Sequence, residues 1–396
     1  MKPAIEGGKP VRGQYLVFGN PEIQQEEIDE VIDSMKSGWL GTGPKVRKFE
    51  ENFQNYIGCK HAKALNSCTA GLHLSQLVSG IKPGDEVITT PLTFASTANT
   101  IIHAGATPIF ADIEKETMNI SPDEIEKKIT KKTKAIIPVH MCGRPCNMDA
   151  INEIAIKHNL IVIEDAAHAV EAKYRGKKIG NISPLTCFSF YVTKNVVTGE
   201  GGMVTTNNSE WAQEIEKYAL HGLSKGAWER YSDKGFKHYQ VLLPGYKYNM
   251  MDLQAAIGLH QLERVENNLK KREKIWKKYD DAFANLPLQT PAHVEKNTTH
   301  ARHLYTILLD IKKLNKDRDF IQDALHRENI GTGIHFISLH LHKFYREKFN
   351  FSQKDFPNAN YISERTISLP LSPKLNDKDV ENVIESVRKV LNYYER

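Results

Sequence analysis

One lysine and one aspartate in this chain have residue types and positions that suit chemistry with an aldehyde cofactor. Lys194 lies in residues 189–202, just after the apolar-rich run 185–191, and Asp165 ends the apolar run 160–165. A lysine can form an imine and a carboxylate can hold a pyridinium nitrogen, which are the two groups a pyridoxal phosphate (PLP) enzyme needs most. Because an opposite charge favours the charged form, such an aspartate keeps the nitrogen protonated and the ring a strong electron sink.

Both residues also have ordinary structural interpretations. Most lysines are solvated, and an aspartate after a strand is often a helix N-cap. Lys194 differs from other lysines because it is the single charged residue in the run 185–198. In such surroundings a lysine is desolvated, which lowers the pKa of its amine and makes the neutral, nucleophilic form accessible. The glycine-rich residues 199–202 then predict a tight turn.

Residues 66–71 are the candidate for a phosphate-binding turn. They follow an expected strand at 61–65 and open an expected helix at 70–78. Backbone N–H groups at a helix N-terminus favour an anion, and the hydroxyls of Ser67 and Thr69 could add hydrogen bonds. An ordinary Ser/Thr cap is the alternative.

Two ring-bearing residues are further candidates. Phe94 follows an expected strand at 86–89, where an aromatic side chain could stack on a cofactor ring or belong to the core. His168 lies one helical turn after Asp165 and could face the same ring, or it could be a satisfied surface histidine.

The elements that would position these residues alternate between strands and helices. The expected strands are 61–65, 86–89, 107–111, 134–139, 160–163, 185–190 and 202–205, and the expected helices are 20–36, 45–56, 70–78, 96–104, 122–129 and 148–158. This alternation implies crossover connections and an α/β fold with a mostly parallel sheet covered on both faces. Ligands bind such sheets outside the carboxyl ends of the strands.

The pattern changes after residue 206. A helical period covers 211–220, and a longer one covers 252–283. Prolines 287 and 291 then indicate a boundary. We therefore expect a large domain at 1–285 and a smaller α+β domain at 286–396. In the smaller domain the expected strands are 304–309 and 333–336, and the expected helices are 317–329 and 377–394.

Composition excludes several classes of protein. The 53 basic and 48 acidic residues are spread along the chain, so no basic patch for nucleic acid is expected. Five cysteines suit a reducing compartment, and the spacing of Cys142 and Cys146, with no second pair, does not indicate a metal site. With no signal-peptide pattern and no apolar segment of about 18 residues, we expect a cytoplasmic protein without a membrane span.

Four segments, in this order along the chain, resemble the signatures of the DegT/StrS sugar aminotransferases: residues 164–169, 189–194, 199–202 and 245–249. The resemblance runs from Gly38 to the final helix. It implies PLP enzymes of fold type I, the aspartate aminotransferase-like fold, which act on nucleotide-linked keto sugars. Residues 331–336 and 342–346 are similar to the UDP-4-amino-4-deoxy-L-arabinose branch of that family.

The resemblance implies roles around the cofactor ring. Lys194 would carry the cofactor as a Schiff base and later shuttle a proton. Asp165 would pair with the pyridinium nitrogen, and His168 would lie near the ring hydroxyl. Phe94 would stack on the ring. Four residues match phosphate-binding positions: Ser67, Cys68, Thr69 and Ser189.

Two further matches concern the second subunit and the substrate. Asn249 matches a residue that reaches the phosphate of the neighbouring subunit's cofactor, which implies a homodimer with shared active sites. His335 matches a position that lines the sugar site. Cys68 and Glu171 stand where the family more often has glycine, and residues 191–193 are bulkier than usual. The differences at Glu171 and at 191–193 leave the exact sugar open.

The resulting hypothesis is an aminotransferase that moves an amino group from L-glutamate to a nucleotide-linked keto sugar in two half-reactions. A dehydratase on the same scaffold is one alternative, although such enzymes replace the lysine with histidine. A non-catalytic PLP-binding regulator is another, although no DNA-binding module stands apart from the core. The aromatic and basic stretch 226–241 could clamp the substrate's diphosphate or form a dimer edge.

Overall fold

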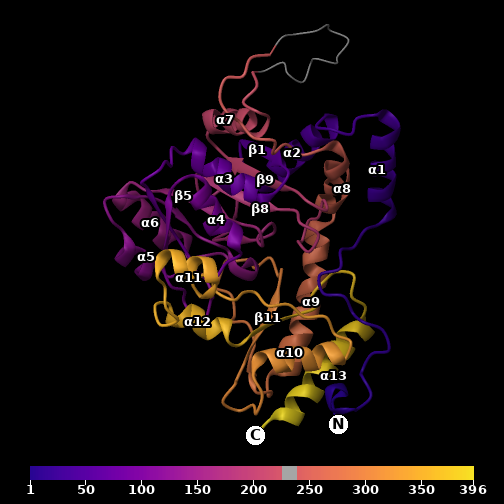
Figure 1. Ribbon diagram of the computed structural model, residues 1–396. Helices are drawn as coiled ribbons and strands as arrows, with labels where there is room; N and C mark the ends of the chain where they lie inside the picture. The colour runs from indigo at the N-terminus through magenta and orange to yellow at the C-terminus, as the bar shows by residue number, and fades with distance from the viewer. Residues whose placement is uncertain (225–238) are drawn as a thin grey trace.

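The computed structural model describes residues 1–224 and 239–396. Most of the stretch 226–241 therefore lies outside the described residues. Figure 1 shows a large sheet with its helices in the upper part of the view and a smaller C-terminal part below it. Both chain ends lie in this lower part.

A seven-stranded sheet forms the centre of the upper part. In order across the sheet its strands are β1 (His61–Leu65), β9 (Gly202–Thr206), β8 (Leu185–Ser189), β5 (Ile161–Asp165), β4 (Thr133–Ile137), β2 (Glu86–Thr89) and β3 (Thr107–Phe110). Strands β3, β2, β4, β5 and β8 pair in parallel, whereas β9 pairs antiparallel with both β8 and β1. The predicted α/β fold with a mostly parallel sheet is confirmed.

Helices cover both faces of this sheet, as strand β8 makes clear. Its Phe188 packs with Phe49 and Phe53 in one core cluster, while the adjacent Cys187 packs with Leu72 in another. Successive side chains of a strand point to opposite faces, so each face of β8 has its own apolar layer. The helices of this part are α2 (Pro44–Ile57), α3 (Cys68–Val78), α4 (Ala95–His103), α5 (Pro122–Lys128), α6 (Met148–His158) and α7 (Ser209–Ala219).

The long helix expected at 252–283 is divided in two, so that prediction is wrong in this detail. Helix α8 (Asp252–Glu263) ends at Arg264, and α9 (Val265–Phe283) begins after it. At this break the Arg264 guanidinium donates to the Glu22 carbonyl at 3.1 Å and pairs with Glu27. Figure 1 shows α9 leading from the large sheet down to the C-terminal part.

The C-terminal part contains a second, antiparallel sheet of strands β10 (Leu288–Gln289), β11 (Tyr305–Leu309) and β12 (Thr366–Leu369). Its helices are α10 (Arg318–Arg327), α11 (Lys343–Phe349), α12 (Pro357–Ser363) and α13 (Asp377–Tyr394). Trp276 and Tyr279 of α9 share its apolar core with Val383 and Val387 of α13. The division into domains at residues 285 and 286 stays a prediction.

Short elements complete the described chain: the 3-10 turns η1 (Ala4–Glu6), η2 (Met141–Gly143) and η4 (Leu339–Leu341), and the hairpin of β6 (Lys173–Tyr174) and β7 (Lys177–Lys178). The strand expected at 333–336 is not formed, because only Gly333 makes a bridge, to Ser368. After that bridge His335 and Phe336 turn their side chains toward other rings instead of continuing a ladder.

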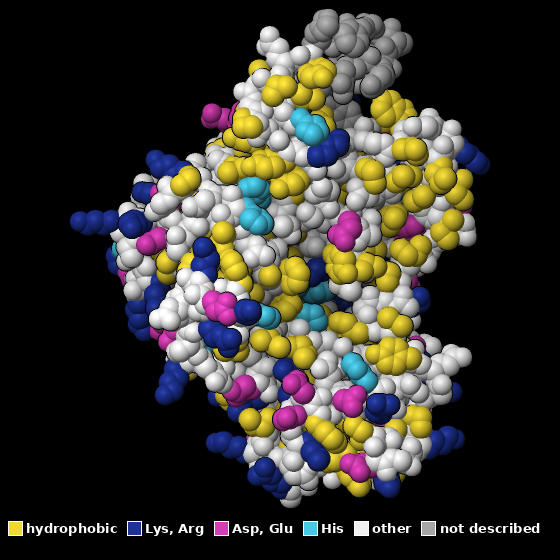
Figure 2. Space-filling view, in the orientation of Figure 1, with side chains coloured by type: hydrophobic (Ala, Val, Ile, Leu, Met, Phe, Trp, Pro, Cys, Tyr) yellow, Lys and Arg dark blue, Asp and Glu magenta, His cyan; other side chains and the backbone are white. Residues whose placement is uncertain are grey.

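Helix α1 (Gln25–Ser37) presents an apolar face to the outside. Ile28, Ile32 and Met35 are 46%, 41% and 64% exposed, and the exposed Trp39 and Leu40 follow them. Figure 2 shows hydrophobic side chains gathered over this helix. Large contiguous apolar patches of this kind commonly mark contact surfaces. Among the described residues, no helix combines the length and apolarity needed to cross a membrane.

Candidate active site

The carboxyl ends of the parallel strands bring most of the predicted residues together. Ser67, Cys68 and Thr69 follow β1, Phe94 follows β2, Asp165 ends β5 and Ser189 ends β8. Because β9 returns beside β8, the connection 190–201 that carries Lys194 lies over the same edge of the sheet. Electrostatic interaction of the Lys194 amine with the Asp165 carboxylate and the Cys68 thiol places these groups in one neighbourhood.

The lysine connection is held at several points. The backbone N–H of Lys194 donates to the Tyr191 carbonyl at 2.8 Å. The Phe190 N–H donates to the Gly201 carbonyl at 2.9 Å, and its carbonyl accepts from the Thr198 N–H at 2.8 Å. The Phe190 ring packs against Phe49 at 5.2 Å between centroids. The amine is therefore presented by a fixed piece of backbone. Burial lowers the pKa of Lys194 to about 8, against the opposing charge of Asp165.

Covalent capture of PLP by Lys194 is expected to follow the neutral amine. Since the pKa of Lys194 is about 8, the capture rate of the cofactor-free protein should rise with pH up to about 8 and then level off. An ordinary lysine would keep gaining reactivity to about pH 10.4. Stopped-flow absorbance after mixing with PLP, across roughly pH 6 to 10, measures this profile. A rate that still climbs through the upper part of this range would contradict the lowered pKa.

Asp165 is buried and fixed by two donors. Thr97 donates from Oγ1 to Oδ2 at 2.8 Å, and the backbone N–H of Ala167 donates to Oδ1 at 3.2 Å. Burial raises the pKa of Asp165, and these hydrogen bonds and the Lys194 charge act in the opposite direction. A buried carboxylate in this state gains from a cationic partner, which a pyridinium nitrogen would supply.

Three histidines surround Lys194: His168, His303 and His335. Burial lowers the pKa of each, and the positive charge of Lys194 is the next largest cause. The rings of His168 and His303 are 4.5 Å apart, and His168 also stacks on Phe336 at 6.2 Å. Figure 2 shows histidine side chains in the hollow at the middle of the molecule.

One ring nitrogen of His168 lacks a hydrogen-bond partner at this site. Its Nδ1 is buried and has no hydrogen-bond partner among the described residues. A buried polar atom without a partner is uncommon and points to a group that the protein alone does not supply. The ring hydroxyl of the cofactor is such a group. His303 was missed by the sequence reasoning, although its position after His300 in the segment 300–303 was a visible signal.

The phosphate cradle is built at the start of α3. Ser67 is the N-cap, and its Oγ accepts from the Ala70 N–H at 3.1 Å. The first N–H groups of a helix lack intrahelical partners, which leaves those of Cys68 and Thr69 available for an anion. A Cβ at Gly202 would lie 2.4 Å from the Cys68 nitrogen, so only glycine lets β9 lie against this turn.

The remaining predicted residues lie around this centre. Phe94 is 62% exposed, so the core interpretation is wrong, and its ring is 6.1 Å from that of Phe336. His335 shares a 2.9 Å hydrogen bond with the Ser368 hydroxyl. The hydroxyl of Ser189 accepts from the Tyr191 N–H at 3.4 Å.

Asn249 lies beside the end of β1 in its own chain, where it forms a bridge with Leu65. Its Nδ2 donates to Thr42 Oγ1 at 2.6 Å, and its Oδ1 is buried with no partner among the described residues. The expected contact with a neighbouring subunit's cofactor stays a prediction.

These residues fit PLP part by part. Lys194 offers an amine of lowered pKa, Asp165 a buried carboxylate, His168 an unpartnered ring nitrogen and the start of α3 an anion site. The fold and this set of groups together define a PLP-dependent aminotransferase.

The family follows from comparison with known proteins. The model of the DegT/DnrJ/EryC1/StrS aminotransferase family matches residues 21–388, and the chain belongs to this family. It is 54% identical over 383 residues to the uncharacterized protein MJ1066 of Methanocaldococcus jannaschii, covering 96% of this chain and 99% of that protein. It is 51% identical over 381 residues to the spore coat polysaccharide biosynthesis protein SpsC of Bacillus subtilis, covering 96% and 98%.

A solved structure supports the same assignment. The putative sugar aminotransferase Spr1654 from Streptococcus pneumoniae, in its pyridoxamine phosphate (PMP) form, superimposes with a TM-score of 0.89 and 33% sequence identity, covering 96% of this chain and 98% of that chain. The same protein has also been solved in its PLP form. PLP is thus the cofactor of this chain, and sugar aminotransferases are its structural neighbours.

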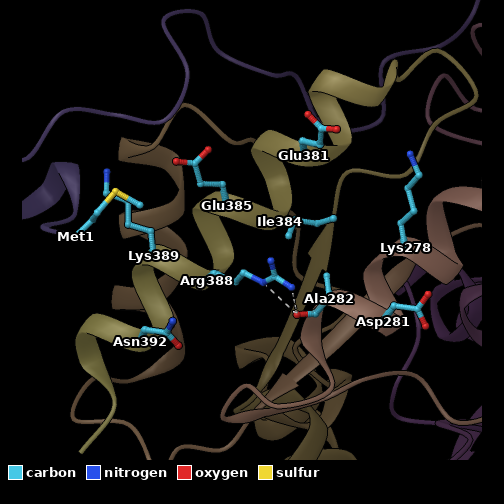
Figure 3. A pocket seen from close by; sticks show the side chains of 10 residues that line it. All are labelled: Met1, Lys278, Asp281, Ala282, Glu381, Ile384, Glu385, Arg388, Lys389 and Asn392. Atoms are coloured by element: carbon cyan, nitrogen blue, oxygen red, sulfur yellow. Dashed lines mark hydrogen bonds between the residues drawn. The ribbon is translucent and has the colours of Figure 1, made fainter.

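A surface groove of about 670 Å³ lies away from this centre, between α9 and α13 (Figure 3). Both acidic and basic side chains line it, and the Arg388 guanidinium donates two hydrogen bonds to the Ala282 carbonyl. All five cysteines are buried without disulfides. The described residues contain no group of three or more His, Cys, Asp or Glu side chains that could hold a metal ion.

Proposed function

We propose that this enzyme transfers the amino group of L-glutamate to a nucleotide-linked keto sugar by a ping-pong mechanism. The observation that best supports this proposal is the Lys194 amine, with a pKa of about 8, near the buried Asp165 at the carboxyl ends of the strands. A base is most effective when its pKa lies near the working pH. When bound, PLP supplies an aldehyde and an electron-withdrawing ring.

The protein's own groups divide the remaining work. Lys194, once free, would take a proton from the α-carbon of L-glutamate and, in the second half-reaction, deliver a proton to the sugar carbon that receives the amino group. Its amine can do both because the neutral and the protonated forms are both accessible near neutral pH. Asp165 would hold a positive charge at the ring nitrogen, and His168 would accept or donate at the ring hydroxyl. The start of α3, with Ser67 to Thr69 and with Ser189 nearby, binds the phosphate. Phe94 would cover one face of the ring.

The acceptor is a UDP-linked 4-keto sugar in our proposal. Residues 331–336 and 342–346 resemble the 4-amino-arabinose branch, and the half-buried His335 from the first of these segments lies near Lys194. The name of the relative SpsC connects the family to polysaccharide biosynthesis. We extend this to polysaccharide or lipopolysaccharide precursors made in the cytoplasm.

The working unit in our proposal is a homodimer with shared active sites. The exposed apolar face of α1, together with Trp39 and Leu40, is the surface that a second copy would cover. Asn249 lies beside the end of β1, where the phosphate cradle begins, and its Oδ1 has no hydrogen-bond partner in the described part of the chain.

Met35→Glu is therefore expected to shift the protein from dimer to monomer, because it places a charge in an apolar contact. Analytical ultracentrifugation over a dilution series measures the change. Ile156→Glu is the matched control, since Ile156 is an exposed apolar residue on α6, away from α1, and 82% exposed. Equal behaviour of the two variants would argue against α1 as the contact surface.

Single-turnover absorbance tests the function directly. L-Glutamate should convert the PLP form of the enzyme to the PMP form and release 2-oxoglutarate. A panel of UDP-, GDP- and dTDP-linked 4-keto sugars should then restore the PLP form, fastest with a UDP sugar. If a keto sugar is consumed while glutamate yields no 2-oxoglutarate, the chain is a dehydratase instead.

A further inference from the structure

A buried ion pair links helix α9 to the residue next to Lys194. Glu171, in the position where the resembling family more often has glycine, pairs with Arg272 of α9, and both side chains are almost fully buried. The second oxygen of Glu171, Oε2, accepts from Asn195 Nδ2 at 2.7 Å. Removing two charges from water is unfavourable unless their geometry is well satisfied. The contacts that satisfy this pair, including the one with Asn195, therefore matter beyond simple packing.

The contacts of Asn195 determine which way its amide points. Besides Glu171, its Nδ2 donates to the Ala301 carbonyl at 3.0 Å. A carboxylate and a carbonyl can only accept hydrogen bonds, so the amide nitrogen must face both. Its Oδ1 is then left to face His303 Nδ1 at 2.9 Å.

This orientation sets the tautomer of His303. Because an amide oxygen can only accept, His303 Nδ1 must carry the proton. In a neutral ring the other nitrogen, Nε2, is then an acceptor. Burial and the nearby Lys194 charge lower the pKa of His303, which keeps the ring neutral.

Nε2 of His303 remains available as an acceptor. This nitrogen has no hydrogen-bond partner among the described residues, and it is not completely shielded from solvent. The ring lies 4.5 Å from that of His168 and is influenced by the charge of Lys194 more than by any other charge. An acceptor at this place can bind only a group that donates.

We propose that Glu171, acting through Asn195, is a positioning residue that fixes His303 as the Nδ1–H tautomer, and that His303 Nε2 then accepts a hydrogen bond from a hydroxyl group of the sugar substrate. The inference rests on the proposed function for the identity of the donor. At neutral pH the carboxylates of L-glutamate have no proton to donate, and its amino group is the group that is transferred, so this acceptor favours the sugar. Loss of this acceptor should therefore slow the half-reaction with the sugar more than the half-reaction with L-glutamate.

The tautomer is tested first, on the PLP-loaded protein labelled with ¹⁵N-histidine. Long-range ¹H–¹⁵N spectra are expected to show His303 with a protonated Nδ1 and an unprotonated Nε2, the signals being assigned by their loss in His303→Phe. Glu171→Gln is expected to mix the tautomers, because the new amide group can also donate to Asn195. A His303 that is protonated at Nε2 in the unaltered protein overturns the inference.

The functional consequence is tested by separating the half-reactions. Glu171→Gln is expected to slow restoration of the PLP form by the fastest panel sugar roughly tenfold more than conversion to the PMP form by L-glutamate, the scale of one hydrogen bond. His303→Phe keeps an aromatic ring but removes the acceptor, and it should show the same split. Equal slowing of both half-reactions in these variants overturns the inference.

Glu328→Gln is the matched control. Glu328 forms a second buried ion pair, with Lys389 at 2.9 Å in the C-terminal part, and has no contact with Asn195. It should lower thermal stability as Glu171→Gln does, without splitting the half-reactions. If no panel sugar reacts with the unaltered enzyme, the proposed function fails, while the tautomer of His303 still decides whether Glu171 acts as a positioning residue.

Discussion

Lys194→Ala is expected to abolish both half-reactions while leaving the fold intact. Without this amine neither L-glutamate nor a keto sugar can exchange with the cofactor through the enzyme, and the group proposed to move the proton is lost. We expect both rates to fall on the order of 10⁴-fold or more. Single-turnover absorbance measures each rate separately.

Borohydride reduction followed by peptide mapping gives a second measure of the same change. In the unaltered protein the label should lie on the peptide that contains residue 194, and in Lys194→Ala it should be absent. Lys178→Ala is the control, because burial also lowers the pKa of Lys178, which lies on β7 and pairs with Glu266 at 2.6 Å. Turnover that persists in Lys194→Ala would refute the assignment.

Loss of Lys194 also has a predicted effect on stability. Burial lowers the pKa of Lys194 to about 8 in the folded protein, below the value of about 10.4 in an unfolded chain. The unfolded state therefore binds more protons between these values, and stability of the cofactor-free protein rises with pH across that window. Lys194→Ala should remove this rise, and below pH 8 it should melt at an equal or higher temperature.

Asp165→Asn is expected to separate attachment of the cofactor from catalysis. Lys194 should still capture PLP, because its amine is retained and loses only the Asp165 charge that raises its pKa. An amide cannot stabilise a positive charge at the ring nitrogen, so both half-reactions should slow by roughly 10²–10³-fold, the scale seen when one electrostatic stabiliser is removed. Borohydride labelling and single-turnover rates on the same preparation measure the two effects.

Asp112→Asn is the control for this change. Asp112 also follows a strand, β3, is buried, and accepts from the backbone N–H groups of Asn358 and Ala359, both at 2.9 Å. Each substitution should reduce stability by about 1–3 kcal/mol, because hydrogen bonds to a charged acceptor are weakened. If Asp112→Asn slows catalysis as strongly as Asp165→Asn, the ring-nitrogen role of Asp165 is wrong.

The centre of the site could be predicted because its residues follow apolar runs. Asp165 and Ser189 are the last residues of parallel strands, and the ends of such strands meet at one edge of the sheet. The apolar surroundings of Lys194 are also visible in its own segment. Local patterns were enough for these residues, and for the α/β fold.

Other features depend on packing between distant segments. His303 lies just before β11 and reaches the site only because α9 and the C-terminal sheet pack beside residues 190–201. The residues around Phe94 in the sequence predict that it belongs to the core, but its ring is largely exposed. The helical period of α1 correctly predicts a helix, yet its apolar residues face outward. Periodicity identifies a helix without saying what covers it.

In the seven-stranded sheet of the described residues, β9 is the one strand whose direction is opposite to that of the other six. Ser189 at the end of β8 pairs in register with Gly202 at the start of β9. Both ends of the connection that carries Lys194 are thus anchored on adjacent strands. Its conformational entropy is lost once, when the chain folds, and not again in each catalytic cycle. A few residues inserted between the two anchors would cost little in loop closure. They would leave a stable enzyme whose amine is no longer preorganised for reaction.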